Sequence, residues 1–409
     1  MWKSKKIAFT SFWFICLVVV SCAPPSDFDS HLSLIVEPYH FSITKWESRV
    51  IFDEAKQWIF GEREKIEDEV YAVTQYFSFV QQMKNMESEI EVIKSGSEPD
   101  AVILFEAELN RLWGRKASLE DVVEKTIERQ IRESLSQQGI FNPLDKYLSL
   151  RVGFPPLNFK LDKAPYLLVV SPRDRIESIR EITLLPGINR EEIEKIEVEV
   201  DRLDVSSLVV GLGGIATYPS FVTNEASLRF TIDTAAEEWL HQYLVFQPLG
   251  FLYLLDLAGI SRNYEIATMN ETLAGIVSKE IGAMVYEQYY SQPGNNDNQD
   301  QVGKPEFDFN GEMRDIRRAV DKYLAWGEIE QAEEFMEQKR QYLASKGYHI
   351  RKLNQAYFAF HGAYADRPIS ISPIGIQLKE LRRQSISLSD FLNIVASMTS
   401  PQDLREYLK

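Results

Sequence analysis

Two adjacent glutamates and a histidine in one apolar stretch have the side chains needed for acid–base or metal chemistry. Glu237 and Glu238 are the only formally charged residues between Thr234 and Leu255, and His241 follows them closely. Most of the surrounding residues are aliphatic or aromatic, which predicts a helix buried on most sides. Because a buried carboxylate without a partner is costly, we expect these acids to have a cation, a metal ion or a raised pKa.

Helical spacing places Glu237 and His241 on one face, since they are four residues apart. Glu238 lies about 100° further round, because a helix has ~3.6 residues per turn. This is the layout of the His-Glu-x-x-His motif, with two ligands one turn apart and a glutamate between them. A further acid, Glu271, lies on the next predicted helix, which we expect Asn270 to cap.

The sequence Asn270-Glu271-Thr272-Leu273-Ala274 completes a resemblance to the gluzincin class of zinc metallopeptidases, over residues 207–290. In that class the third ligand is a glutamate in an Asn-Glu-x-x-Ala-like sequence. The resemblance implies a zincin-like core with a two-helix metal site, in which Glu238 is the base that activates a metal-bound water. It implies that the metal ligands are Glu237, His241 and Glu271.

One position departs from the class, because its first ligand is a histidine and this chain has Glu237. A Glu-His-Glu set is compatible with zinc, or with manganese or iron instead. Two alternatives stay open: a decayed site without metal, or acids that face solvent or a salt bridge while His241 is an ordinary core residue. The spacing of Glu238 and His241 also fits half of a di-iron site, but the only other such pair, Glu37–His40, contains a proline.

Three polar aromatic residues lie on one stripe of the helix predicted at 353–364: Tyr357, His361 and Tyr364. The resemblance implies that Tyr357 or His361 stabilises the oxyanion of a tetrahedral intermediate. The alternative is an aromatic core stripe with satisfied polar tips.

The glycine-rich segment 211–222 is predicted to be extended, and the resemblance makes residues 214–222 the strand that borders the cleft. It lacks the Gly-x-Met-Glu-Asn sequence of gluzincin aminopeptidases, so no exopeptidase is predicted. It opens no predicted helix and no Lys-Ser/Thr follows, which excludes a phosphate loop. The chain also has no Gly-x-Ser-x-Gly elbow, which argues against a serine hydrolase.

The N-terminus predicts export. A short basic segment precedes an apolar run at 7–20, which is shorter than the roughly 20 residues of a membrane span. Residues 19–22, Val-Val-Ser-Cys, resemble a lipobox and imply cleavage of a signal peptide at 1–21 and lipidation of Cys22. The alternative is an uncleaved anchor helix. The other cysteine, Cys16, lies in the signal peptide, so no disulfide is expected.

Composition limits the partners. The chain is 44% hydrophobic, which is typical of a globular protein, and loss of three signal-peptide lysines would change its formal charge from −16 to −19. Such an acidic chain argues against nucleic acid as a partner. The lipid on Cys22, rather than surface charge, would hold the protein at a membrane outside the cytoplasm.

The periodicity predicts an α+β fold that is mostly helical. Within the core we expect strands at 157–161, 166–171 and 207–211, a helix at 191–201, and two apolar helices in 231–290. Later we expect a helical hairpin around Gly327 and a last helix capped by Ser400. The predicted regions are a lipidated tether at 22–43, N-terminal helices at 44–146, the zincin-like core at 147–290, a flexible polar loop at 291–305 and C-terminal helices at 306–409.

These features together predict a membrane-tethered, extracytoplasmic metallopeptidase-like hydrolase that cleaves amide bonds of a peptide or protein. The alternative is a catalytically inactive, peptidase-like surface lipoprotein that binds a peptide or an envelope partner.

Overall fold

The computed structural model describes residues 27–60, 68–96, 99–143, 153–291, 307–362 and 372–409. Within them the chain is mostly helical with two small sheets, which confirms the predicted α+β class. The predicted signal peptide, Cys22, Tyr364 and all but the first residue of the predicted polar loop lie outside these ranges. No described helix is both long enough and apolar enough to cross a membrane.

The N-terminal segment is folded where a tether was expected. Helix α1 (Asp27–Val36) and the short helix η1 (Glu37–Tyr39) lead to His40, which pairs with Leu184 of a sheet. Leu32 and Val36, one turn apart, are buried in the hydrophobic cluster of that sheet. The tether prediction is therefore wrong for residues 27–43, because apolar residues at helical spacing give α1 a face to bury.

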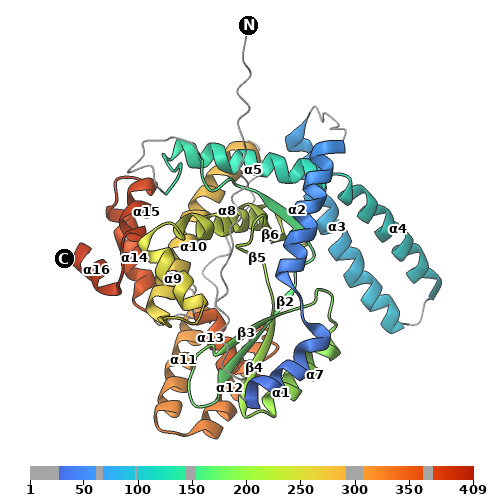
Figure 1. Cartoon of the computed structure of the whole chain (residues 1–409). Helices are drawn as coiled ribbons and strands as arrows, with labels where there is room; N and C mark the ends of the chain where they lie inside the picture. Colours follow the sequence, from blue (N-terminus) through green and yellow to red (C-terminus); the bar gives the residue numbers. More distant parts are fainter. Residues whose placement is uncertain (1–26, 61–67, 97–98, 144–152, 292–306, 363–371) are drawn as a thin grey trace.

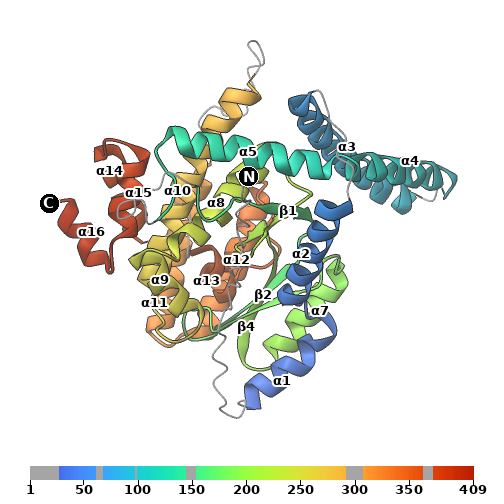
Figure 2. The same ribbon diagram turned by 45° about the horizontal axis from the view of Figure 1, so that its top comes forward.

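Four helices occupy the region predicted to be helical: α2 (Ile43–Phe60), α3 (Glu69–Gly96), α4 (Pro99–Ala117) and α5 (Glu120–Gln137). Helices α3 and α4 project from the rest of the molecule as a hairpin (Figures 1 and 2). Helix α5 begins after Leu119, which occupies the N-cap position without a side-chain hydrogen bond, and the Ser118 hydroxyl donates to the Arg115 carbonyl.

One antiparallel sheet has the order β3-β2-β4, formed by β2 (Tyr166–Pro172), β3 (Arg180–Leu184) and β4 (Val205–Gly211). Side chains alternate across it, so that Leu168 and Val170 join the cluster of α1 and α7 (Arg190–Asp201). Val169 faces the other way, toward α13 (Gln355–Gly362). The predicted helix 191–201 and the strands at 166–171 and 207–211 are confirmed, and β3 is additional.

The second sheet has the order β1-β6-β5 and lies beside the helices that carry the candidate site. Strand β1 (Phe159–Asp162) runs parallel to β6 (Ser220–Thr223), and β5 (Gly214–Ile215) pairs with the opposite edge of β6 in the antiparallel sense. Two residues join β4 to β5, so the chain passes directly from one sheet to the other.

Three helices, rather than the two predicted, fill most of residues 228–289: α8 (Leu228–Leu244), α9 (Pro248–Leu257) and α10 (Tyr264–Tyr289). Helix α10 begins after Asn263, whose side chain accepts hydrogen bonds from two backbone N–H groups. The prediction that Asn270 caps a helix is therefore wrong, and Glu271 lies inside α10 rather than in its first turn. The apolar surfaces of these helices pack together in the largest hydrophobic cluster.

The C-terminal helices divide into two groups. Helices α11 (Phe309–Ala325) and α12 (Ile329–Ser345) form the predicted hairpin, with Gly327 at a φ of 76° in the turn. Helices α14 (Ile374–Gln384), α15 (Leu388–Ala396) and α16 (Pro401–Tyr407) pack around α10. The predicted cap at Ser400 is confirmed, with Asp403 completing a capping box.

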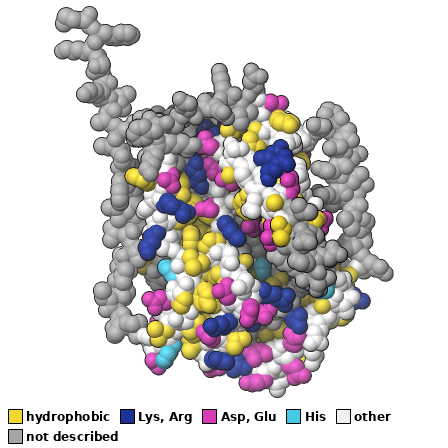
Figure 3. Space-filling model, turned by 90° about the vertical axis from the view of Figure 1, so that its right-hand side faces the viewer, with side chains coloured by type: hydrophobic (Ala, Val, Ile, Leu, Met, Phe, Trp, Pro, Cys, Tyr) yellow, Lys and Arg dark blue, Asp and Glu magenta, His cyan; other side chains and the backbone are white. Residues whose placement is uncertain are grey.

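The range 147–290, expected to be one core, contributes to several hydrophobic clusters. The two with most of its buried residues lie around the sheet β3-β2-β4 and around α10, and Val169 and Leu208 belong to a third, against α13. On the face in Figure 3, Asp and Glu side chains gather over the lower part of the molecule and are interspersed with Lys and Arg. Acidic and basic side chains therefore share this surface, despite the formal net charge of −16.

Candidate metal centre

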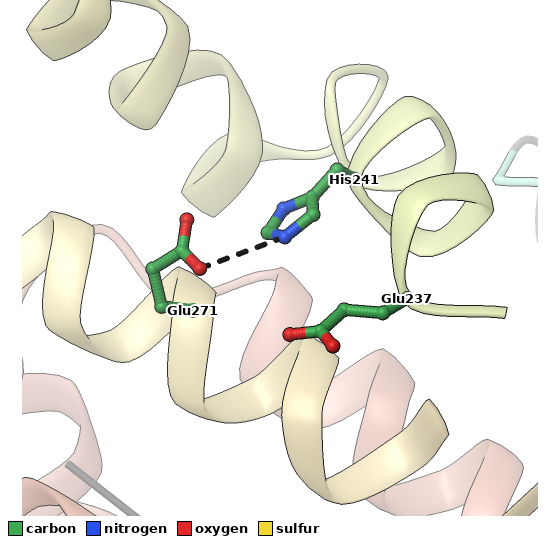
Figure 4. Close-up of side chains that lie close together, drawn as sticks. All are labelled: Glu237, His241 and Glu271. Carbon is green, nitrogen blue, oxygen red and sulfur yellow. Dashed lines mark ion pairs between the residues drawn. The ribbon is translucent and has the colours of Figure 1, made fainter. Parts of the chain in front are cut away.

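Three side chains from two helices converge at one point (Figure 4). Glu237 and His241 lie one turn apart on α8, and Glu271 reaches toward them from α10. One potential ligand atom of each lies within 4.8 Å of the other two. Within the described ranges, this is the only group of three or more His, Cys, Asp and Glu residues with such spacing. The three predicted metal ligands are therefore brought together and could hold a metal ion.

Close packing of antiparallel helices brings Glu271 within reach of α8. A Cβ atom on Gly282 of α10 would lie 1.7 Å from Oδ1 of Asp233 on α8, so a larger residue would have to displace the Asp233 side chain. Further along, Asn270 of α10 contacts His241 of α8.

The distance between His241 and Glu271 fits a shared ion better than a direct bond. Nε2 of His241 lies 3.7 Å from Oε2 of Glu271, and both side chains are largely buried. A charged hydrogen bond would be about 2.7–2.9 Å long. Two ligand atoms bound tetrahedrally at ~2.1 Å from one ion lie about 3.4 Å apart. The observed separation is thus close to that of two ligands on a common ion.

Glu271 has one satisfied and one unsatisfied oxygen. The hydroxyl of Tyr253 on α9 donates to Oε1 over 2.5 Å. Oε2 is buried and has no hydrogen-bond partner among the described residues, and Glu271 is only 7% exposed. An unpaired buried carboxylate oxygen is costly, whereas a cation in front of it would remove the cost. The donor set therefore fits a divalent metal ion.

Asn270 contacts the ring nitrogen of His241 that points away from Glu271. Its amide nitrogen lies 3.1 Å from Nδ1, while its Oδ1 is buried without a partner among the described residues. A half-turn of the amide exchanges the two atoms at almost no steric cost. Oδ1 would then accept the Nδ1 proton, which leaves the Nε2 lone pair free for an ion. Asn270 can thus fix the tautomer of the ligand histidine.

Glu238 lies on α8 next to Glu237 but contacts a different part of the molecule. A Cβ atom on Gly214 would lie 2.4 Å from Oε1 of Glu238 and 2.6 Å from Cγ2 of Thr234. Strand β5 therefore lies directly against this carboxyl group, and any side chain at position 214 would have to displace Glu238 and Thr234. The Gly-rich segment 211–222, which is not a phosphate loop, thus brings strand β5 to the site.

The environment of Glu238 favours its protonated form. Its pKa is raised well above the usual value, first by burial and then by repulsion from Glu237 and Glu271. Within the described part of the chain, no lysine or arginine is ion-paired with Glu238 or Glu271. A bound cation would offset the repulsion between the three acids and lower this pKa.

Tyr357 and His361, predicted to support an oxyanion, lie side by side on α13 with ring centroids 4.3 Å apart. Helix α13 packs on the sheet β3-β2-β4, and its end meets α10, because the Tyr264 hydroxyl donates to the Gly362 carbonyl. Tyr264 precedes Glu271 by two helical turns, or about 10 Å. The oxyanion role of Tyr357 or His361 stays a prediction.

Sequence reasoning missed Tyr253. The segment between the two ligand-bearing helices is almost entirely apolar, and Tyr253 supplies a hydroxyl in the middle of α9. A single polar atom in such a helix usually has a buried partner. That signal pointed to Tyr253, but the sequence alone does not identify Glu271 as the partner.

Comparisons of this chain with protein-family models, with curated proteins and with solved structures found no match.

Proposed function

We propose that this protein is a metal-dependent hydrolase that cleaves peptide or protein amide bonds outside the cytoplasm, held at a membrane by a lipid on Cys22. The observation that carries the proposal is the convergence of Glu237, His241 and Glu271. The buried Oε2 of Glu271 accepts no hydrogen bond from the described residues and lies 3.7 Å from Nε2 of His241. Zinc fits two carboxylates and an imidazole, and manganese or iron are the alternatives.

Each residue has a distinct role in this proposal. A divalent ion held by Glu237, His241 and Glu271 would polarise the scissile carbonyl and acidify a water molecule. Glu238 would take the proton from water and pass it to the leaving amine. Its position beside the ligands, rather than among them, suits that role, and its raised pKa favours keeping a proton once it has accepted one. Tyr357 or His361 would stabilise the oxyanion.

A peptide substrate is supported by the edge of strand β5. The Thr223 N–H donates to the Gly213 carbonyl, and the alternation of an antiparallel ladder then turns the Gly214 N–H and carbonyl away from β6. Neither group has a hydrogen-bond partner among the described residues. An extended peptide could add to this edge beside Glu238.

Two other sheet edges are closed by side chains. On β1, Glu124 and Glu128 accept from the N–H groups of Leu161 and Phe159. On β4, Glu197 and Asp201 accept from the N–H groups of Val209 and Ser207. The contrast supports a ligand role for the edge of β5 at Gly214, whose N–H and carbonyl have no partner among the described residues, because strand edges are normally protected.

The second candidate is a catalytically inactive, peptidase-like lipoprotein that binds a peptide or an envelope partner at the same edge. Glu237 favours it, since this residue replaces the histidine of the gluzincin class. The two candidates share the peptide site and differ in metal content and turnover.

The deciding experiment measures bound metal by mass spectrometry on the full chain, purified in detergent without chelators. We expect about one equivalent of zinc, manganese or iron, lost in Glu271→Ala and His241→Ala. Glu238→Gln should keep the metal and lose peptide hydrolysis. Glu280→Gln is the matched control, because Glu280 lies on α10 but pairs with Arg382. A well-folded wild type without metal would sink the catalytic proposal and favour the binding protein.

A further inference from the structure

We infer that Tyr253 is a positioning residue of the metal centre, whose hydroxyl holds Oε1 of Glu271 so that only Oε2 faces the ion. The inference rests on the proposed function and concerns the way in which the third ligand is oriented. Tyr253 does not belong to the set of three ligands, and it acts through Glu271.

The fold places Tyr253 opposite α10 through a tight turn after α8. The backbone N–H of Gln247 donates to the Leu244 carbonyl, and α9 begins at Pro248. A Cβ atom on Gly250 would lie 2.1 Å from the Leu244 carbonyl oxygen, so only glycine lets α9 fold back this closely. Tyr253 lies one turn after Gly250. Its hydroxyl reaches Glu271, and its ring centroid lies 6.1 Å from that of His241 on α8.

The hydrogen bond from Tyr253 limits which oxygen of Glu271 can coordinate a metal ion. A carboxylate coordinates an ion through one or both oxygens, and a tyrosine hydroxyl at 2.5 Å occupies Oε1. The remaining oxygen, Oε2, is the buried atom without a partner among the described residues, and it lies 3.7 Å from Nε2 of His241. Tyr253 thus favours coordination through Oε2 alone, with a low coordination number that leaves room for water and substrate.

A purely structural role of Tyr253 and a role in orienting Glu271 predict different results when Tyr253 is substituted. If Tyr253 only satisfied a buried acid, its loss would lower stability with and without metal alike. If it orients Glu271, its loss would weaken metal binding, because partners that orient a ligand are typically worth 10–100-fold in metal affinity.

The test compares Tyr253→Phe with Tyr290→Phe in the full chain loaded with Co²⁺. Tyr290 is the matched control, because its hydroxyl donates a short hydrogen bond to Gln130 from the far end of α10. Phenylalanine fills the same space at both positions, and urea unfolding of the metal-free proteins checks that both fold. We expect Tyr253→Phe to bind Co²⁺ about 10–100-fold more weakly. Its visible absorption should also weaken as Oε1 joins the coordination shell.

Two results would overturn the inference, and they are distinguishable. Wild type and Tyr253→Phe with the same Co²⁺ affinity and the same spectrum would remove the positioning role and leave the proposed function intact. A wild type that binds no Co²⁺ and contains no native metal would remove both. Tyr290→Phe should match the wild type in affinity and spectrum.

Discussion

Buried glutamates in two parts of the molecule have different partners. Glu197, on α7 beside the sheet β3-β2-β4, is 3% exposed, accepts two hydrogen bonds from Arg351 and one from the Val209 N–H, and lies 3.7 Å from Lys352. Glu271, on α10, is 7% exposed and is paired with no lysine or arginine among the described residues. Its partners are the Tyr253 hydroxyl and a histidine.

The acids on α5 resemble Glu197 rather than Glu271. Glu124 is bonded to Lys160 and to the Leu161 N–H, and Glu128 is bonded to Lys125. In these places the chain supplies both the buried anion and its cation. At the convergence of α8 and α10, the ion pairs among the described residues bring no lysine or arginine to Glu238 or Glu271. This contrast is the strongest reason to expect a metal ion there.

The largest expected difference in stability is between two substitutions in metal-free protein. One neutralises Glu197, which is paired with an arginine, and the other neutralises Glu271 at the candidate metal centre. Glu197→Gln should lower the free energy of unfolding by about 3 kcal/mol, because breaking a buried ion pair leaves its partner uncompensated. This is near the low end of the usual range, since the Arg351 side chain is 30% exposed. Glu271→Gln should cost less than about 1 kcal/mol or stabilise the protein, because it removes a buried charge that is paired with no lysine or arginine among the described residues. Urea unfolding with a chelator measures both.

In excess metal, Glu271→Gln should lower the free energy of unfolding relative to the wild type, which it does little or not at all without metal. A ligand at 100 times its dissociation constant stabilises the folded state by about 2.7 kcal/mol, and Glu271→Gln should lose that gain. A loss from Glu271→Gln as large as that from Glu197→Gln in metal-free protein would contradict the comparison. It would mean that protonated His241 already compensates the charge.

A smaller effect is expected from pH at Glu124. Burial raises its pKa from 4.5 to about 7, against the lowering effects of Lys160 and the Leu161 N–H. The folded state therefore binds this proton more tightly than the unfolded state, so stability is highest below the unfolded pKa and falls as pH rises toward the folded pKa. The contribution is about 3 kcal/mol at most.

Urea unfolding of metal-free wild type and Glu124→Gln between about pH 4.5 and about pH 7 tests this. The wild type should lose stability relative to the variant as pH rises. A constant difference would show that Lys160 compensates the carboxylate fully. The predicted outcome would show that even an acid paired with a lysine keeps its proton near neutral pH. The acids at α8 and α10, which lack such a partner among the described residues, would then need a cation all the more.

An effect no larger than that of Glu197→Gln is expected where strand β5 meets the site. Gly214→Ala should cost about 1–3 kcal/mol or displace Glu238, because the new Cβ would lie 2.4 Å from its carboxyl oxygen. Gly211→Ala is the matched control, since its Cβ would meet only Tyr166 at 4.0 Å. Measurements of unfolding free energy and of peptide hydrolysis should show a loss for Gly214→Ala and little change for Gly211→Ala. Equal behaviour would argue against a close contact between β5 and Glu238.

Several elements followed from local sequence signals. The cap at Ser400, the hairpin at Gly327 and helix α7 depend on residues a few positions apart, and all three are present. The ligand pair Glu237 and His241 also depends only on helical spacing within α8. These predictions succeeded because hydrogen bonds and side-chain neighbours within one helix are set by neighbours in sequence.

Other predictions failed where packing between distant segments decides. The segment 27–43 looked like a tether, because its hydrophobic partners on β2–β4 lie more than 100 residues away in sequence. Asn270 looked like a cap, because the sequence gives no means to choose between it and Asn263. Tyr253 was missed because its hydrogen-bond partner is on another helix.

The order of residues sets which side chains are available: two acids and a histidine at helical spacing, a third acid on a later helix, and few basic residues near them. Whether these side chains meet depends on how the helices and strands pack. Gly282 lets α8 and α10 pack closely, Gly250 turns Tyr253 toward Glu271, and Gly214 brings β5 against Glu238. Contacts of this kind depend on backbone approaches between separate elements, which no local pattern in the chain encodes.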